Sequence, residues 1–156
     1  TTGEDPVDLI LWRHADAKDG DGPVPDAERE LTARGIKHAR EMADWLREQK
    51  LAKVTVLSGP ARRCIQTAEM LGLPVKVKKQ LGVGASTADL LGAAEWPDQS
   101  GAIILVSHQP ALGRLAAVLL AGSEADWTIK KGGVWWFTNR VRDDETQTVL
   151  RAVRNP

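Results

Sequence analysis

Short apolar runs along this chain alternate with segments in which apolar residues recur every three or four positions. The runs over residues 7–12, 54–57 and 102–107 predict buried strands, because a strand covered on both faces is apolar at nearly every position. Further strands are predicted over residues 75–77, 133–138 and 147–153. The polar segment 139–146 between the last two strands indicates an antiparallel hairpin.

Helical periodicity occupies the intervals between the strands. The clearest helix is predicted over Thr32–Glu48. Its apolar face carries Ile36, Ala39, Met42, Ala43 and Leu46. A second helix is predicted after Pro60, and the side chains that it would bury are Cys64, Ile65, Ala68 and Leu71. Two more helices are predicted near Thr87–Trp96 and over Ala111–Ala121, the latter with Pro110 in its first turn, where proline is favoured.

Strands that alternate with helices are typical of an α/β fold. We therefore expect a three-layer αβα arrangement, with a mostly parallel, doubly wound sheet and an antiparallel edge strand from the C-terminal hairpin. At 156 residues the chain fits a single domain over residues 1–156, since domains commonly run to roughly 100–200 residues. Residues 1–6 are expected to form a flexible N-terminal extension.

Composition narrows the classes of function. Lys and Arg together number 21, as do Asp and Glu, so the molecule has no overall field that would favour nucleic acid or an anionic membrane. Cys64 is the only cysteine, which excludes an internal disulfide and fits a reducing, cytoplasmic compartment. The N-terminal segment has no signal-peptide pattern, and the apolar runs are far shorter than the roughly 18 residues of a membrane span. An anion site must therefore come from local clustering.

Basic side chains follow three of the predicted strands. His14 comes directly after the first strand, in Arg13-His14-Ala15-Asp16; Arg63 follows the second strand, and His108 follows the strand over 102–107. The carboxyl ends of parallel strands meet at one edge of a sheet, which is where open α/β sheets bind ligands. We therefore expect these side chains to converge although they are far apart in sequence.

Such a cluster suits phosphate chemistry. Arg13 and Arg63 are permanently charged and can bind phosphate in a bidentate manner, and His108 adds a donor beside the positive end of the helix that follows it. His14 can then attack phosphorus through a ring nitrogen, forming a phosphohistidine that water hydrolyses. The attack requires a neutral imidazole, and the nearby arginine charges lower its pKa. Further candidates for phosphate binding or proton donation are Asp16 and Gln109.

Four segments carry a family resemblance: Leu11–Ala17 around the Arg-His pair, Leu31–Gly35, Arg63–Ala68 with its Gln-Thr-Ala, and Val106–His108. Together they resemble the histidine phosphatase superfamily, and the short chain is most similar to its SixA-type phosphohistidine phosphatases. The resemblance runs in the family's order from about Val7 to Leu120. It implies the phosphoglycerate mutase-like version of the αβα fold and an enzyme that needs no cofactor and no metal.

The resemblance also implies roles for the clustered residues. His14 matches the family's nucleophile, Arg13 and Arg63 its phosphate clamp, and His108 its second pocket histidine. The family's arginine stands three residues before Gln-Thr, which selects Arg63 over the adjacent Arg62.

The chain departs from the family pattern at three places. Ala15 stands where most members have Gly, and Gly59 stands where a Ser is usual, with Ser58 one position earlier. The third departure concerns Gln80–Gly84, which lacks the carboxylate that phosphoester-cleaving members usually carry there. An alkoxide leaving group needs a proton from such an acid, whereas an imidazole, with a pKa of about 6.5, leaves more readily. The missing acid favours phosphohistidine as substrate, with Asp16, where SixA-type members have an acid, as an alternative proton donor.

The middle of the chain is also short. Only about thirty residues separate the Arg63 helix from the strand over 102–107, which leaves little chain for a lid. An open pocket admits a side chain of another protein, so we expect the substrate to be a histidine-phosphorylated phosphotransfer domain or phosphocarrier, and the product to be inorganic phosphate.

Two alternatives remain open. One is a small-molecule phosphomonoesterase of the same superfamily, which relative turnover of a phosphohistidine protein and an aryl phosphate would distinguish. The other is a non-catalytic module for phosphorylated partners, which would bind phosphate without turnover.

Other motifs have plainer interpretations. Lys130-Lys131 can steer an acidic partner but is more simply a solvated charge pair, and Trp135 and Trp136 are expected on opposite faces of their strand. A Cys-based tyrosine phosphatase needs an arginine six residues after its cysteine, but position 70 is Met70. The chain has neither a Gly-Lys-Ser/Thr phosphate loop nor a Gly-x-Ser-x-Gly elbow, and its histidines lack metal-ligand spacing.

Overall fold

The computed structural model describes residues 6–20 and 22–156. Its strands are β1 (Val7–Arg13), β2 (Val54–Ser58), β3 (Val75–Val77), β4 (Ala102–Ser107), β5 (Val134–Arg142) and β6 (Glu145–Arg154). Its helices are α1 (Ala33–Glu48), α2 (Arg62–Glu69), α3 (Thr87–Ala94) and α4 (Ala111–Ala121), with short 3-10 turns η1 (Asp26–Glu28) and η2 (Lys79–Leu81). The extension expected over residues 1–6 lies outside the described residues except for Pro6. No helix in the described part of the chain is long and apolar enough to cross a membrane.

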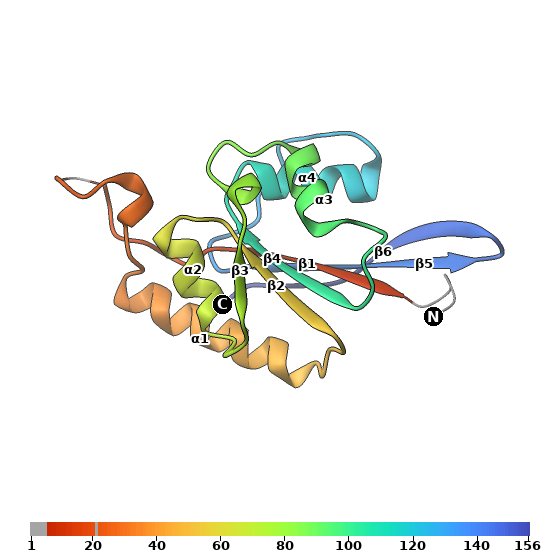
Figure 1. Ribbon diagram of the computed structural model, residues 1–156, viewed down its shortest axis with the longest axis horizontal. Helices are drawn as coiled ribbons and strands as arrows, with labels where there is room; N and C mark the ends of the chain where they lie inside the picture. The colour runs from red at the N-terminus through yellow and green to blue at the C-terminus, as the bar shows by residue number, and fades with distance from the viewer. Residues whose placement is uncertain (1–5, 21) are drawn as a thin grey trace.

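The strands form one sheet in the order β3-β2-β4-β1-β5-β6. The first four strands in the chain run parallel to one another, whereas β5 pairs antiparallel with both β1 and β6. Figure 1 shows α1 and α2 on one face of the sheet and α3 and α4 on the other. The predicted αβα arrangement, with antiparallel pairing at one edge, is therefore confirmed.

Strand register brings the carboxyl ends of β1 and β4 level with each other. Arg13 of β1 is paired with Ser107 of β4, and the His14 backbone N–H donates to the Ser107 carbonyl at 3.2 Å. The residues that directly follow this pair are His14 and His108, so the register places the two histidines side by side. On the other side of β4, the Gly59 backbone N–H donates to the Val106 carbonyl at 3.0 Å, which brings the end of β2 to the same edge.

Two apolar cores lie on opposite faces of the sheet. The core beneath α1 and α2 includes Trp12 and Met42, and the core beneath α3 and α4 includes Leu105 and Phe137. Each fully buried large side chain contributes about 1.5–3 kcal/mol to folding. Trp136 packs in the first core while Trp135 contacts the second, so their predicted opposite orientation is confirmed.

The C-terminal hairpin differs from the prediction. The loop expected over 139–146 is only the pair Asp143-Asp144, and β5 and β6 extend to either side of it. Both aspartates have positive φ, at 53° and 62°, which is the geometry of a two-residue hairpin turn that twists with its strands. The polar residues of 139–146 were misleading because residues 140–146 are only partly buried or exposed, and half-exposed strands tolerate polar side chains.

Smaller differences concern helix limits. Helix α3 ends at Ala94, two residues before the predicted end, where Glu95 adopts a left-handed conformation. Ile36 and Ile65, expected to be buried, are only partly buried because they lie at the margin of their helices' apolar faces.

The start of α1 is fixed against the loop that follows β1. Thr32 caps the helix by accepting a hydrogen bond from the Gly35 backbone N–H at 2.9 Å, and its own N–H donates to the Asp16 carbonyl at 3.0 Å. A Cβ added to Gly35 would lie 2.0 Å from the Asp16 carbonyl oxygen. The helix can approach this loop so closely only because residue 35 has no side chain.

We therefore expect Gly35→Ala to lower the stability of the protein by about 1–3 kcal/mol, the usual range for overpacking against backbone. Urea unfolding followed by circular dichroism would measure the change. Gly92→Ala is the matched control, because Gly92 lies in α3 with no atom within 4 Å of its added Cβ, so an alanine there should be neutral or stabilising by up to about 1 kcal/mol. Equal stabilities of the two variants would contradict the close contact at Asp16.

Candidate active site

His14 and His108 lie at the carboxyl edge of the sheet with Arg63 beside them. The two imidazole centroids are 5.3 Å apart and the rings meet edge to face at 63°. Arg63, in the first turn of α2, has one terminal nitrogen 3.5 Å from Nδ1 of His108. All three side chains are buried, with Arg63 only 4% exposed. Segments separated by up to 94 positions thus form one compact cluster.

A hydrogen bond determines the tautomer of His14. Its Nδ1 lies 2.8 Å from the carbonyl oxygen of Ala15. Because a carbonyl can only accept, Nδ1 carries the hydrogen and the lone pair of a neutral ring lies on Nε2. His14 therefore presents Nε2 as its nucleophilic atom.

Both imidazoles are held in the neutral form. Burial, followed by the charges of His108, Arg63 and Arg13, lowers the pKa of His14 to about 3, although the bond to Ala15 opposes the shift. Burial and the Arg63 charge likewise lower the pKa of His108 to about 4. The sequence analysis gave the arginine charges as the cause of the lowered pKa, but burial of the rings away from water is the larger cause. Neutral His14 is thus available for attack across the whole physiological pH range.

This shift predicts an NMR titration. A ring with lowered pKa gains its proton only below that pKa, so the ring nitrogens of His14 and His108 should keep neutral chemical shifts from pH 8 down to about pH 5. In urea-unfolded protein the same rings should titrate near their ordinary pKa of about 6.5. A midpoint between pH 6 and 7 for His14 in the folded protein would contradict the burial of this ring.

The two arginines have donor groups that no protein atom uses. Within the described residues, Nε of Arg13 and Nε of Arg63 are buried without a hydrogen-bond partner. Arg13 donates one terminal N–H to the Ile129 carbonyl at 2.9 Å, which fixes its position. Buried cationic donors without acceptors are costly in a folded protein. An anion bound beside these arginines would offset the charge of both guanidinium groups.

Asp26 is a site residue that the sequence analysis missed. It lies in η1, in the loop that follows β1, and its carbonyl and carboxylate accept hydrogen bonds from Arg63 at 2.9 and 3.2 Å. Arg29 also binds its carboxylate, at 3.0 Å. The side chain of Asp26 is 61% exposed. The bonds of Asp26 to Arg63 bring this loop to the cluster, and Figure 1 shows the loop with its short 3-10 turn at one end of the molecule.

No sequence motif indicated Asp26, because the surrounding residues 16–30 have only the Gly, Pro and Asp content of an ordinary loop. The one available signal was its spacing to Arg29, three residues away, which is compatible with a local ion pair. The contact with Arg63 depends on how the loop folds back and could not be inferred.

Asp16 and Gln109, the remaining candidates, are both bound to protein groups. The Asp16 carboxylate accepts from the Thr32 hydroxyl at 2.8 Å and from Lys131 at 3.3 Å. These hydrogen bonds, that of Thr32 first, lower the pKa of Asp16, so the carboxylate is ionised. The amide of Gln109 donates to the Trp127 carbonyl at 3.0 Å and accepts from the Gly113 N–H at 2.8 Å. Its side chain thus joins α4 to the loop before β5.

The Gln-Thr pair of α2 holds the loop that carries His14. The Thr67 hydroxyl accepts from the Ala15 N–H at 3.1 Å and donates to the Arg63 carbonyl at 2.8 Å. The side-chain amide oxygen of Gln66 accepts from the Leu31 N–H at 2.8 Å. These two residues position the nucleophile loop against the helix of Arg63.

The structure explains why position 59 is a glycine, although a Ser is usual there in the family. A Cβ at this position would lie 2.4 Å from the Leu81 carbonyl oxygen. The backbone at Leu81, which also accepts a hydrogen bond from Ser107 at 2.8 Å, therefore leaves no room for a side chain at position 59.

Cys64, next to Arg63 in α2, is a buried core residue as predicted, and burial raises the pKa of its thiol to about 12.

Taken together, the geometry provides a neutral imidazole nucleophile, a second imidazole and two guanidinium groups with free donors. A positive and a negative unit charge about 4 Å apart attract each other by roughly 4 kcal/mol at an effective dielectric near 20. Such a cluster can bind a phosphoryl group and stabilise the greater charge of its transition state. Among the described residues no group of three His, Cys, Asp or Glu side chains could hold a metal ion.

Comparisons with known proteins agree with this chemistry. The sequence model of the histidine phosphatase superfamily (branch 1) matches residues 9–82. The phosphohistidine phosphatase SixA of Escherichia coli K12 is 32% identical over 126 residues, which cover 74% of this chain and 76% of that protein.

Solved structures match over nearly the full length. A structure of the protein histidine phosphatase SixA complexed with tungstate superposes with a TM-score of 0.74 at 25% identity, covering 95% of this chain and 96% of that one. A putative phosphohistidine phosphatase SixA from Nakamurella multipartita superposes with a TM-score of 0.77 at 21% identity, covering 97% of both chains. The sequence resemblance and the fold that it implied are both supported.

Proposed function

The chain belongs to the histidine phosphatase superfamily, and on that premise we propose that it removes phosphate from a phosphohistidine residue of a partner protein. As a member of this superfamily the protein is a phosphatase, a hydrolase. The observation that carries the proposal is the neutral His14, whose Nδ1 is bound to the Ala15 carbonyl and whose Nε2 is free beside two cationic side chains.

The proposed reaction has two steps. In the first, Nε2 of His14 attacks phosphorus, the P–N bond of the substrate breaks, and the released imidazole takes up a proton from water. In the second, a water molecule attacks the phosphorus on His14 and the P–N bond to Nε2 breaks. The protons of that water pass to the inorganic phosphate and to solvent, and the neutral ring of His14 is restored. Arg13 and Arg63 hold the phosphoryl oxygens in both steps, and His108, whose ring lies beside Arg63, binds the same group.

The ionised state of two loop carboxylates supports phosphohistidine rather than a phosphoester as substrate. Among the described residues of the loop that follows β1, Asp16 lies two residues after His14 and Asp26 contacts Arg63. Hydrogen bonds from Thr32 and Lys131 keep Asp16 ionised. Burial opposes the same effect at Asp26, but its bonds to Arg29 and Arg63 prevail and lower its pKa. An ionised carboxylate is a poor general acid for an alkoxide leaving group, whereas an imidazole leaves without strong assistance.

We place this reaction in the cytoplasm, with a phosphotransfer domain or phosphocarrier as the partner. The similarity to SixA of E. coli, a phosphohistidine phosphatase by name, supports the phosphohistidine substrate. The single buried thiol of Cys64 fits a reducing compartment.

Relative turnover of three substrates tests the proposal: a histidine-phosphorylated phosphocarrier, an aryl phosphate and an alkyl phosphate. We expect kcat/KM to be highest for the phosphocarrier and at least about 100-fold lower for the alkyl phosphate, whose leaving group needs an acid. The variant His14→Asn corrects for spontaneous hydrolysis of phosphohistidine. Preference for the alkyl phosphate would indicate a small-molecule phosphomonoesterase, and phosphate binding without turnover would indicate a binding module.

A further inference from the structure

A cationic pocket adjoins the proposed catalytic site on the side of Arg13. We use this name for a cavity of about 390 Å³ whose charged lining comes from Arg13, Asp16, Arg34, Lys130 and Lys131. Four of these five side chains are positive, although positive and negative residues balance over the whole chain. Positive charge is therefore concentrated in the lining of this pocket.

Asp16, the one side-chain carboxylate in the lining, does not neutralise the pocket. Asp16 is bound by the Thr32 hydroxyl and by Lys131. Within the described residues Arg34 and Lys130 take part in no ion pair, and both are exposed. Two cations thus remain available to a ligand from solvent.

The wall that carries Lys130 and Lys131 is tied to the nucleophile. The Gly132 backbone N–H donates to the carbonyls of Arg13 and His14, at 3.1 and 3.0 Å, and the Gly132 carbonyl accepts from the indole of Trp12 at 3.1 Å. These bonds fix the loop that carries the two lysines against the end of β1.

The opposite wall is tied to the same residues. Arg34 is in the first turn of α1, which is held to Asp16 through the bond from the Thr32 N–H to the Asp16 carbonyl. The contact of Gly35 with Asp16 holds the helix close. A ligand in the cationic pocket would therefore sit at a defined distance from a phosphoryl group on His14.

We propose that the cationic pocket binds carboxylate side chains that flank the phosphohistidine of the partner protein. The inference rests on the proposed function and adds a rule of substrate selection to it. Exposed lysine and arginine side chains on long stems suit an acidic protein surface, which they attract before contact and orient on arrival. A small bisphosphate would instead be expected to require buried, bidentate donors, and Arg34 and Lys130 are exposed.

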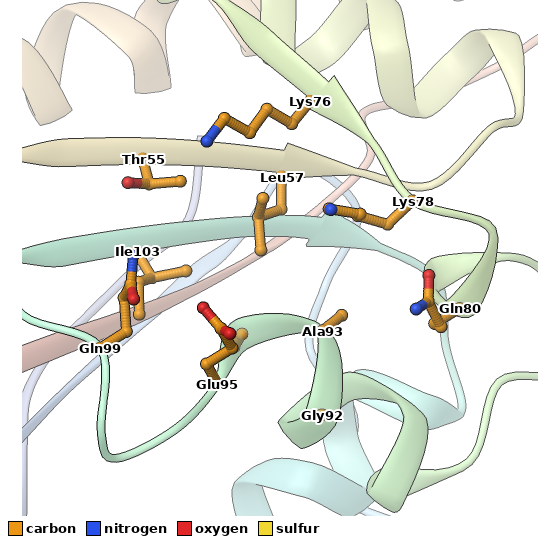
Figure 2. A pocket seen from close by; sticks show the side chains of 11 residues that line it. Thr55, Leu57, Lys76, Lys78, Gln80, Gly92, Ala93, Glu95, Gln99 and Ile103 are labelled. Carbon is orange, nitrogen blue, oxygen red and sulfur yellow. The ribbon is translucent and has the colours of Figure 1, made fainter.

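A second lysine pair supplies a matched control. Figure 2 shows Lys76 of β3 and Lys78, which follows that strand, beside another cavity, of about 280 Å³, with Leu57 and Ile103 also in its lining. None of the residues that line it belongs to the cluster around His14. Replacing this pair by Gln removes the same total charge as replacing Arg34 and Lys130, without changing the cationic pocket.

The experiment compares the Arg34→Gln/Lys130→Gln and Lys76→Gln/Lys78→Gln variants with the unchanged protein. The substrates are a phosphohistidine peptide with Glu on both sides of the phosphorylated residue, the same peptide with Gln in place of Glu, and an aryl phosphate. We expect the first variant to lose about tenfold in kcat/KM on the acidic peptide at low ionic strength, mainly through KM, and to change by less than about twofold on the other two substrates. The control variant should change by less than about twofold on all three.

Different outcomes separate the two proposals. If the unchanged protein hydrolyses both peptides but the first variant loses nothing on the acidic one, or loses equally on all substrates, the cationic pocket does not select carboxylates. An equal loss in the control variant would assign the effect to net charge and also overturn the inference.

Failure of the unchanged protein to hydrolyse either peptide, with the aryl phosphate still turned over, would overturn the proposed function and this inference with it. Inhibition by a small bisphosphate that disappears only in the first variant would assign the pocket to a small-molecule substrate instead.

Discussion

Replacing His14 by Asn is expected to reduce phosphatase turnover by roughly 10³-fold or more, because Nε2 of His14 is the proposed acceptor of the phosphoryl group. Asn is the sharpest substitution for this position. Its side-chain amide can still donate to the Ala15 carbonyl, as Nδ1 of His14 does at 2.8 Å, while it offers no nucleophilic nitrogen. Loss of activity in this variant would therefore report on Nε2 and not on the loop that holds the residue.

Trapping of the intermediate gives the matching direct measurement. A labelled phosphodonor should leave one acid-labile, base-stable phosphate per molecule, and peptide mapping should place it on His14. The chain has 3 histidines, so label on the peptide of His38 or His108 is a recognisable alternative. Label at either of those positions, or normal turnover by His14→Asn, would exclude His14 as the nucleophile. Unfolding curves that coincide for the variant and the unchanged protein would show that the fold is intact.

The second large effect is expected from Arg63. Changing it to Gln should lower kcat/KM by about 10²–10³-fold, the range observed when one preorganised donor to a transition-state charge is removed. Arg63→Lys should recover only part of this loss, because a lysine cannot bind phosphate in a bidentate manner. Inorganic phosphate should also inhibit the Gln variant less strongly.

Arg62 provides a control at the adjacent position. Its side chain is 50% exposed and its partner Glu30 lies 3.7 Å away on the surface. Such ion pairs contribute about 0–1 kcal/mol, so Arg62→Gln should keep activity within about twofold. Equal losses in the two variants would mean that α2 contributes general positive charge and that Arg63 has no special place in the site.

The contact between Asp26 and Arg63 bears on how this measurement is interpreted. Asp26 accepts two hydrogen bonds from the terminal nitrogens of Arg63, so part of the guanidinium is already engaged before a substrate arrives. The buried Nε has no partner among the described residues. Because Nε is closed to solvent, a phosphoryl group can bind Arg63 by replacing the exposed carboxylate of Asp26. Unfolding curves of the Arg63 variants would separate a loss of this loop contact from a loss of phosphate binding.

Several features of the fold could be predicted because they depend on local pattern. The strand over Ala102–Ser107 is apolar except at its last residue, and its limits agree with the structure. Helix α4 over Ala111–Ala121 follows from periodicity and from Pro110 at its start. The hairpin limits could not be predicted in the same way, since three of the four residues in 139–142 are polar and this segment becomes a strand through pairing with β6.

The sequence by itself determined which chemical groups stand at the strand ends: His14 after β1, Arg63 after β2 and His108 after β4. It did so because buried strands and amphipathic helices are recorded in the order of apolar residues along the chain. The tertiary structure alone decided that Arg13 pairs with Ser107, that Asp26 folds back onto Arg63 and that Lys130 faces the same pocket as Arg34. These are contacts between remote segments. They depend on strand register and loop path, which are fixed by the packing of the whole molecule and not by any local pattern.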